Sequence, residues 1–251
     1  MSIVVSNKQK IHYELAGDKG PWMLLLPPHM IPMNAWKEGG YVKQLEEDFR
    51  LVLIEPLGQG YSDAPKNYSH FSISSRIRHV LDIMREVQAD YAYFLGMGLG
   101  AQVGFQMSKE FPRRIRSLIT AGAQPYQELE EAQFLKEKLD KLRSGNISTY
   151  LQQWHSLDHL TEGQEKVILQ GDTEAYALGL EASINWDGLG DDLKSLVTTT
   201  LLFTAKTESR FLSVRDAGKR MRYGRYMILP ELLYSHGLWG CLLYTSPSPR
   251  D

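Results

Sequence analysis

Residues 92–101 of this chain read AYFLGMGLGA, and this stretch decides the fold. It opens with a short apolar run, which is typical of a buried strand. From Leu99 to Phe111 the pattern is helical, and Pro112 ends the predicted helix because proline cannot continue it. Glycines at every second position between the two elements predict a tight turn. A buried strand that turns sharply into a helix indicates an α/β protein.

Apolar runs alternate with amphipathic segments on both sides of this turn, the pattern of stacked βαβ units. We therefore expect a mostly parallel, twisted sheet flanked by helices. The predicted strands span residues 2–5, 10–15, 22–26, 51–54, 92–95, 115–121, 199–205 and 226–229. The predicted helices of the core span residues 35–49, 73–87, 99–111 and 213–221, with Ser213 as the N-cap of the last.

Residues 125–196 contain no convincing strand. Helices are predicted there at 129–144, 149–157, 161–169 and 173–184, with Gly145 after the first and Thr161 as an N-cap. A helical insertion between two strands is interpreted as a cap over the sheet edge. We expect one domain over residues 1–240, with a core of 1–124 and 197–240 and a cap of 125–196.

The composition excludes several classes of protein. A formal net charge of −2 over 251 residues favours neither nucleic acid nor an anionic membrane as a partner. One cysteine, Cys241, permits no intrachain disulfide. No signal peptide is visible, and no segment reaches the roughly 18 apolar residues of a membrane span, so we expect a cytoplasmic protein. Residues 241–251 carry no period and are expected to be a non-native-looking, disordered tail.

The turn at residues 96–100 fits the strand–turn–helix context of the nucleophile elbow, G-x-S-x-G. Here the chain resembles the α/β-hydrolase family. Further matches follow in the family's order: HYELAG at 12–17, LLLPPH at 24–29, EPLGQGYSDAP at 55–65, the helical cap, and a histidine after the last strand. The resemblance implies an α/β-hydrolase fold with a helical cap.

The resemblance assigns each catalytic role of the family to a position in this chain, but not every position holds a residue that can perform it. It puts the nucleophile at Gly98, which has no side chain to attack with, and the general base at His236. It puts the orienting acid at Ser209, with the carboxylate of Glu208 adjacent. Backbone N–H groups of His29 and Leu99 would form the oxyanion hole, which needs no particular side chain.

The family also implies an apolar cleft between cap and sheet, suited to a small, mostly apolar molecule. Met97, Trp154 and Trp186 are the expected lining, and no cofactor is implied. His155 and His159 have the spacing of a helical metal pair, but a third ligand is not evident, so a polar cap face is favoured over a metal site. The sequence leaves the substrate and the oligomeric state open.

Several functions are consistent with these residues. The leading hypothesis is a protein of ester or lactone hydrolase descent that has lost acyl transfer and binds a small ligand. The alternatives are a non-covalent hydrolase or lyase with His236 as general base, and an esterase silenced on purpose at Gly98. Gly96, Gly98 and Ala101 also fit a relaxed dinucleotide fingerprint. That fingerprint expects an acid after the next strand, and none follows until Glu128.

Overall fold

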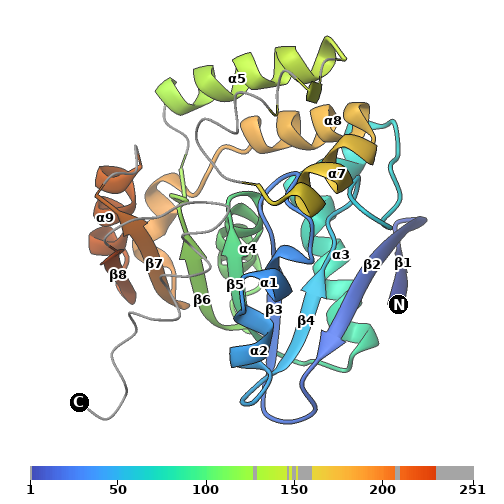
Figure 1. Ribbon diagram of the computed structural model, residues 1–251. Coiled ribbons are helices and arrows are strands. Elements are labelled where there is room, and N and C mark those ends of the chain that lie inside the picture. Colours follow the sequence, from blue (N-terminus) through green and yellow to red (C-terminus); the bar gives the residue numbers. More distant parts are fainter. Residues whose placement is uncertain are drawn as a thin grey trace.

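The computed structural model describes residues 2–126, 129–145, 147–148, 151, 160–206 and 210–229. An eight-stranded sheet in the order β1-β2-β4-β3-β5-β6-β7-β8 forms its centre (Figure 1). The β1–β2 and β2–β4 pairs are antiparallel and all later pairs are parallel, which confirms the predicted mostly parallel sheet. The strands are β1 (Ser2–Ser6), β2 (Gln9–Ala16), β3 (Trp22–Leu26), β4 (Arg50–Ile54), β5 (Ala92–Met97), β6 (Ile115–Ala121), β7 (Thr199–Ala205) and β8 (Gly224–Leu229).

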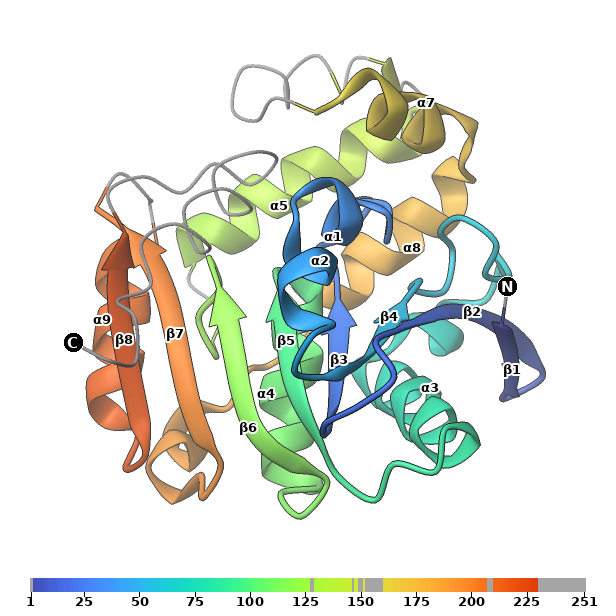
Figure 2. The same ribbon diagram turned by 60° about the horizontal axis from the view of Figure 1, so that its bottom comes forward.

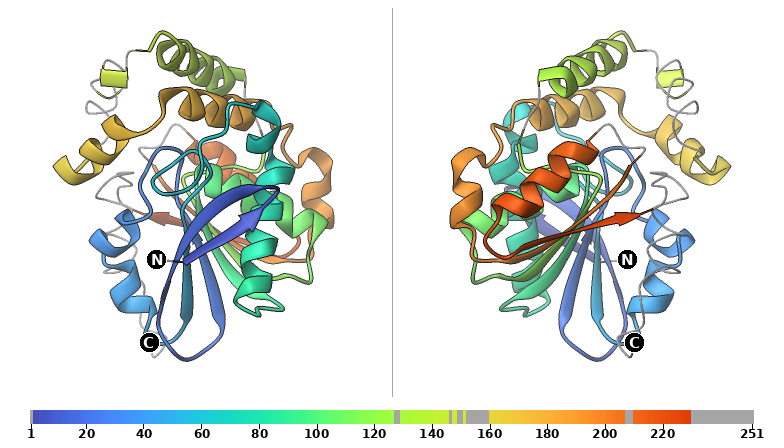
Figure 3. Two further views of the ribbon diagram at one scale, coloured as in Figure 1. Left: turned by 90° about the vertical axis from the view of Figure 1, so that its right-hand side faces the viewer. Right: turned by 90° about the vertical axis from the view of Figure 1, so that its left-hand side faces the viewer.

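Helices cover both faces of the sheet, α1 and α2 on one and α3, α4 and α9 on the other (Figure 3). Helices α5, α7 and α8 lie over the carboxyl ends of the parallel strands (Figure 2). The helices are α1 (Ala35–Glu38), α2 (Tyr41–Leu45), α3 (Ile73–Glu86), α4 (Leu99–Glu110), α5 (Leu129–Arg143), α7 (Glu162–Gln170), α8 (Thr173–Ile184) and α9 (Phe211–Arg220), with 3₁₀ turns η1 (Tyr68–Phe71) and η2 (Gly190–Ser195).

Neighbouring side chains along a central strand pack into two separate hydrophobic cores, one on each face of the sheet. In β3, Leu24 packs into the cluster that contains the buried residues of α3 and α4, while Leu25 packs into the cluster that contains Trp36 of α1. Strands covered on both faces need apolar residues at every position, not at alternate ones. This explains why apolar runs located the central strands β3, β4 and β5 in the sequence.

Two helix predictions are wrong in detail. The helix predicted at 35–49 is two short helices, because Gly40 between them has φ +79°, outside the helical region. The helix predicted from Ser213 begins at Phe211, with Arg210 as its N-cap. The predicted helix 149–157 and the loop with His236 lie largely or wholly outside the described residues.

The cap helices are fixed to the core by side-chain hydrogen bonds. Trp186, just after α8, donates from Nε1 to Oε1 of Gln106 on α4 at 2.9 Å. Ser183 of α8 donates to Oε1 of Gln102, one turn earlier on α4, at 2.5 Å. Thr161 caps α7 in a reciprocal capping box with Gln164, as its predicted N-cap role requires. Within the described residues, no helix is both long and apolar enough to cross a membrane.

Candidate functional site

The turn between β5 and α4 has the strained geometry of an elbow. Gly98 lies between Met97, the last residue of β5, and Leu99, the first of α4, with φ +49° and ψ −116°. Residues other than glycine rarely adopt a positive φ. Where they do, the surrounding structure enforces the strained conformation. The backbone here therefore places residue 98 at the tip of the turn, above the carboxyl end of the sheet.

The two flanking glycines are required by close packing. A Cβ on Gly96 would lie 2.5 Å from the carbonyl oxygen of Gly100, and a Cβ on Gly100 would lie 2.1 Å from the carbonyl oxygen of Leu26. These backbones of β5, α4 and β3 meet without room for a side chain. At Gly98 the nearest atom to an added Cβ is Cβ of Pro28, at 3.3 Å. Packing alone thus leaves space for a small side chain at residue 98.

The predicted oxyanion donors lie at the two sides of this turn. Leu99 is in the first turn of α4, where a backbone N–H has no acceptor inside the helix. His29 follows the carboxyl end of β3, and its ring meets Tyr176 of α8 edge to face at 6.2 Å. The buried ring nitrogens of His29 have no hydrogen-bond partner among the described residues. Burial, and then the positive charge of Arg76, lower the pKa of His29 to about 3, so its ring is neutral at pH 7.

The turn after β4 is held by a buried polar network. Oε2 of Glu55 accepts from Nδ1 of His12 at 2.8 Å and from the backbone N–H of Tyr61 at 2.7 Å. The hydroxyl of Ser62 donates to the carbonyl of Glu55 at 2.7 Å and accepts from the backbone N–H of His12 at 2.9 Å. The network ties the N-terminal hairpin to this turn, so these residues have a structural role.

The described structure brings together only part of the predicted site. Gly98, Leu99 and His29 lie around the β5–α4 turn. Met97 is fully buried in the cluster with Trp36, and Trp186 packs on α4, so both contribute to the interior. Their predicted role as ligand lining stays a prediction. The other predicted site residues lie outside the described residues: Trp154, Glu208, Ser209 and His236.

Two buried polar residues of α3 were missed by sequence reasoning. Arg76 and His79 are 5% and 3% exposed, within a helix whose apolar stripe was read without them. Arg76 lies three residues after Ile73 and four before Val80, and His79 lies four residues before Ile83. This helical spacing places both on the core side and was the available signal. In the described part of the chain, no group of three or more His, Cys, Asp or Glu residues is arranged to hold a metal ion.

The geometry of the sheet and turn agrees with the comparisons with known proteins. The family model for the alpha/beta hydrolase fold matches residues 24–158. This chain belongs to the alpha/beta hydrolase fold family. The crystal structure of the enol-lactonase from Burkholderia xenovorans LB400 superposes with a TM-score of 0.81 at 18% identity, over 93% of each chain. At that identity the likeness shows the fold alone.

Curated relatives in this family have diverse named activities. A candidate 2-succinyl-6-hydroxy-2,4-cyclohexadiene-1-carboxylate synthase of Bacillus subtilis (strain 168) is 20% identical over 209 residues, which cover 76% of each chain. Epoxide hydrolase 4 of Mus musculus is 26% identical over 111 residues, which cover 44% of this chain and 30% of that protein. Shared descent therefore leaves the reaction open, and the site must decide it.

Proposed function

We propose that this alpha/beta hydrolase binds a small, mostly apolar molecule beneath its cap and does not perform serine-type acyl transfer. One observation carries the proposal: Gly98 keeps the backbone of the elbow and supplies no nucleophile. Removal of the serine from a catalytic triad costs about 10⁶ in kcat, and the residual rate comes from the oxyanion hole and binding. Cys241 lies outside the described residues and is not placed as a substitute.

The position of the cap supports the ligand-binding part of the proposal. In open α/β sheets, ligands bind outside the carboxyl ends of the parallel strands. Helices α5, α7 and α8 lie over that edge here, and α8 contacts the loop that carries His29. Alpha/beta hydrolases bind small substrates, and a strand edge covered by helices is a common place for a site of that kind.

The test compares p-nitrophenyl acetate hydrolysis by the unmodified chain, Gly98→Ser, Gly98→Ala and the double variant Gly98→Ser/Pro28→Gly. The Pro28 substitution removes the atom that a Cβ at residue 98 would approach at 3.3 Å. We expect an acyl-enzyme burst only from the variants with a hydroxyl at residue 98. Gly98→Ala, which adds the same Cβ without a hydroxyl, is the matched control and should stay inactive.

Two results would overturn the proposal. A burst from the unmodified chain would show that another residue is the nucleophile. Hydrolysis by the unmodified chain that is lost in His236→Ala, without a burst, would assign the non-covalent mechanism in which His236 acts as general base.

A further inference from the structure

A buried guanidinium lies beneath the cap without a complete set of partners. Arg76 of α3 is 5% exposed, and its Nε donates to the carbonyl oxygen of Phe71 at 2.9 Å. Its Nη2 is buried and has no hydrogen-bond partner among the described residues. A buried charge that is neither paired nor fully hydrogen-bonded is strongly destabilising, so proteins normally pair it or bind an ion there.

The surroundings of Arg76 provide no counter-charge. In the described part of the chain, no carboxylate forms an ion pair with Arg76, and burial alone lowers its pKa to about 10, which leaves it charged at pH 7. Two titratable groups on which the charge of Arg76 acts are His29 and His79. The pKa of each is lowered to about 3, first by burial and then by the charge of Arg76, so neither histidine carries a charge at pH 7.

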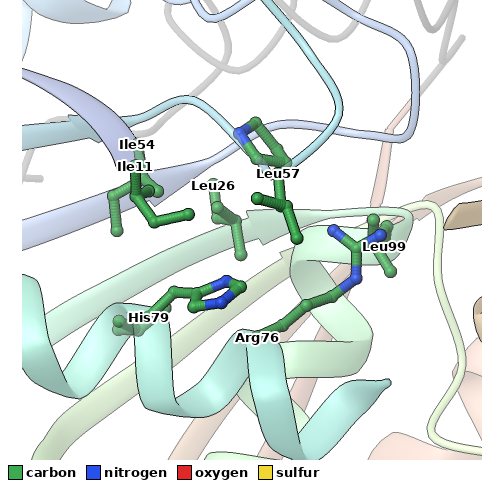
Figure 4. Close-up of a pocket in the computed structure, with 9 residues that line it drawn as sticks. Ile11, Leu26, Ile54, Leu57, Arg76, His79 and Leu99 are labelled. Atoms are coloured by element: carbon green, nitrogen blue, oxygen red, sulfur yellow. The ribbon is translucent and has the colours of Figure 1, made fainter. Parts of the chain in front are cut away.

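A small cavity opens beside this group. It has a volume of about 10 Å³ and is lined by Arg76, His79 and Leu99 together with apolar side chains that include Leu57. Figure 4 shows the guanidinium beside Leu99, with the His79 ring turned toward the same space from the next turn of α3. A cavity of this size holds one water-sized particle. Leu99 connects the cavity to the β5–α4 turn.

We propose that Arg76 anchors a buried site for a halide ion beneath α8, because a cavity of about 10 Å³ has room for a single monatomic ion and not for a carboxylate. The inference goes beyond the proposed function and does not rest on it. An anion would supply both the missing charge and the acceptor for Nη2. The apolar remainder of the lining strengthens the attraction because it excludes water.

The packing of α8 over this site is consistent with a closed binding position. A Cβ on Gly179, in the middle of α8, would lie 2.8 Å from Cε1 of His29 and 3.1 Å from Nη2 of Arg76. Glycine inside a helix is unfavourable relative to alanine, so a close approach gives a reason for its presence. The cap helix thus lies close against Arg76, and a side chain at residue 179 would displace the guanidinium that is proposed to hold the anion.

The experiment measures the shift in thermal unfolding midpoint with sodium chloride, sodium acetate and acetamide, the neutral analogue of acetate. It uses the unmodified chain, Arg76→Met and Arg85→Met. Arg85 is the matched control, because it lies on the same helix and its side chain is 77% exposed. We expect chloride at about five times its Kd to raise the midpoint of the unmodified chain and Arg85→Met by roughly 2–4 °C. Arg76→Met, and every titration with acetate or acetamide, should show no such shift.

The two salts test the size of the site. A shift with chloride but not with acetate supports the halide site, and an equal shift with acetate would contradict a cavity of about 10 Å³ as the binding position. Equal shifts in Arg76→Met and Arg85→Met would overturn the proposal, since they would report a general salt effect and leave water as the occupant. If Arg76→Met does not fold, Gly179→Ala gives the same decision, because its added Cβ should weaken anion binding at least tenfold. Unchanged binding in Gly179→Ala would then contradict the site.

The experiments distinguish a failure of the anion-site proposal from a failure of the proposed function. The anion shift is read without turnover, so its absence leaves the argument from Gly98 intact. An acyl-enzyme burst from the unmodified chain would reject the proposed function whether or not Arg76 binds an anion.

Discussion

Gly96, Gly98 and Gly100 share one turn and are glycine for different reasons. At residues 96 and 100 an added Cβ would overlap backbone atoms of neighbouring elements, which cannot move without displacing a strand or helix. At residue 98 the restriction is the positive φ, while the space beside it is only moderately tight. A residue at the tip of the elbow is therefore replaceable in a way that its two neighbours are not.

This difference predicts unequal costs for alanine in the same turn. Gly100→Ala should lower the free energy of unfolding by at least about 3 kcal/mol, because its Cβ overlaps the carbonyl of Leu26. Gly98→Ala should cost only about 1–2 kcal/mol, the strain of a non-glycine residue at positive φ. Urea unfolding of both variants measures the difference. Equal costs would show that close packing does not distinguish the two positions.

His79 predicts how stability responds to acid. Its pKa is lowered to about 3 in the folded protein, while an unfolded histidine titrates near 6.5, so the unfolded chain binds the proton more tightly. Stability is therefore lost as the pH falls below about 6.5, and this residue should remove about 2 kcal/mol between pH 7 and pH 5. In His79→Gln that part of the loss should vanish, as measured by urea unfolding at both pH values. His70→Gln is the control, and an unchanged pH dependence in His79→Gln would contradict the assignment.

At the scale of elements, the cap depends on how α8 is fixed to α4. Replacing Trp186 with phenylalanine keeps most of the buried ring and removes the hydrogen bond to Gln106. We expect this change to loosen α8 by about 1 kcal/mol, a roughly fivefold faster local exchange of its amide hydrogens. Hydrogen exchange with mass spectrometry makes the measurement. Trp22→Phe, at the amino end of β3 and far from the cap, should leave α8 unchanged, and equal effects of the two variants would argue against local fixation.

The elements differed in how well their sequences predicted them. Strand β3 and helix α8 have the predicted bounds, since the strand is a continuous apolar run and the helix lies between its caps Asp172 and Asn185. The weak apolar period over 35–49 predicts one helix, although residues 39 and 40 are both glycine. The positive φ of Gly40 ends the helical backbone there, and the apolar period does not reveal it.

At the scale of the whole molecule, the fold was predictable because the central strands are buried on both faces and are therefore apolar over most of their length. The site was harder to predict from the sequence, because its properties depend on contacts between elements that are far apart in the chain. His29, Arg76 and Gly179 belong to a loop, α3 and α8, and only the folded chain brings them together. The roles assigned to His236, Glu208, Ser209 and Trp154 fall outside the described residues and stay predictions.

The central claim is that the elbow persists while its nucleophile is absent. A fluorophosphonate probe, which reacts covalently with activated serine hydroxyls, tests it most directly when labelling is read by intact mass. We expect no label on the unmodified chain or on Gly98→Ala, and one label, mapped to residue 98, on Gly98→Ser/Pro28→Gly. Labelling of the unmodified chain would contradict the loss of the nucleophile. Failure to label the double variant, if it is folded, would contradict a site that is intact apart from its nucleophile.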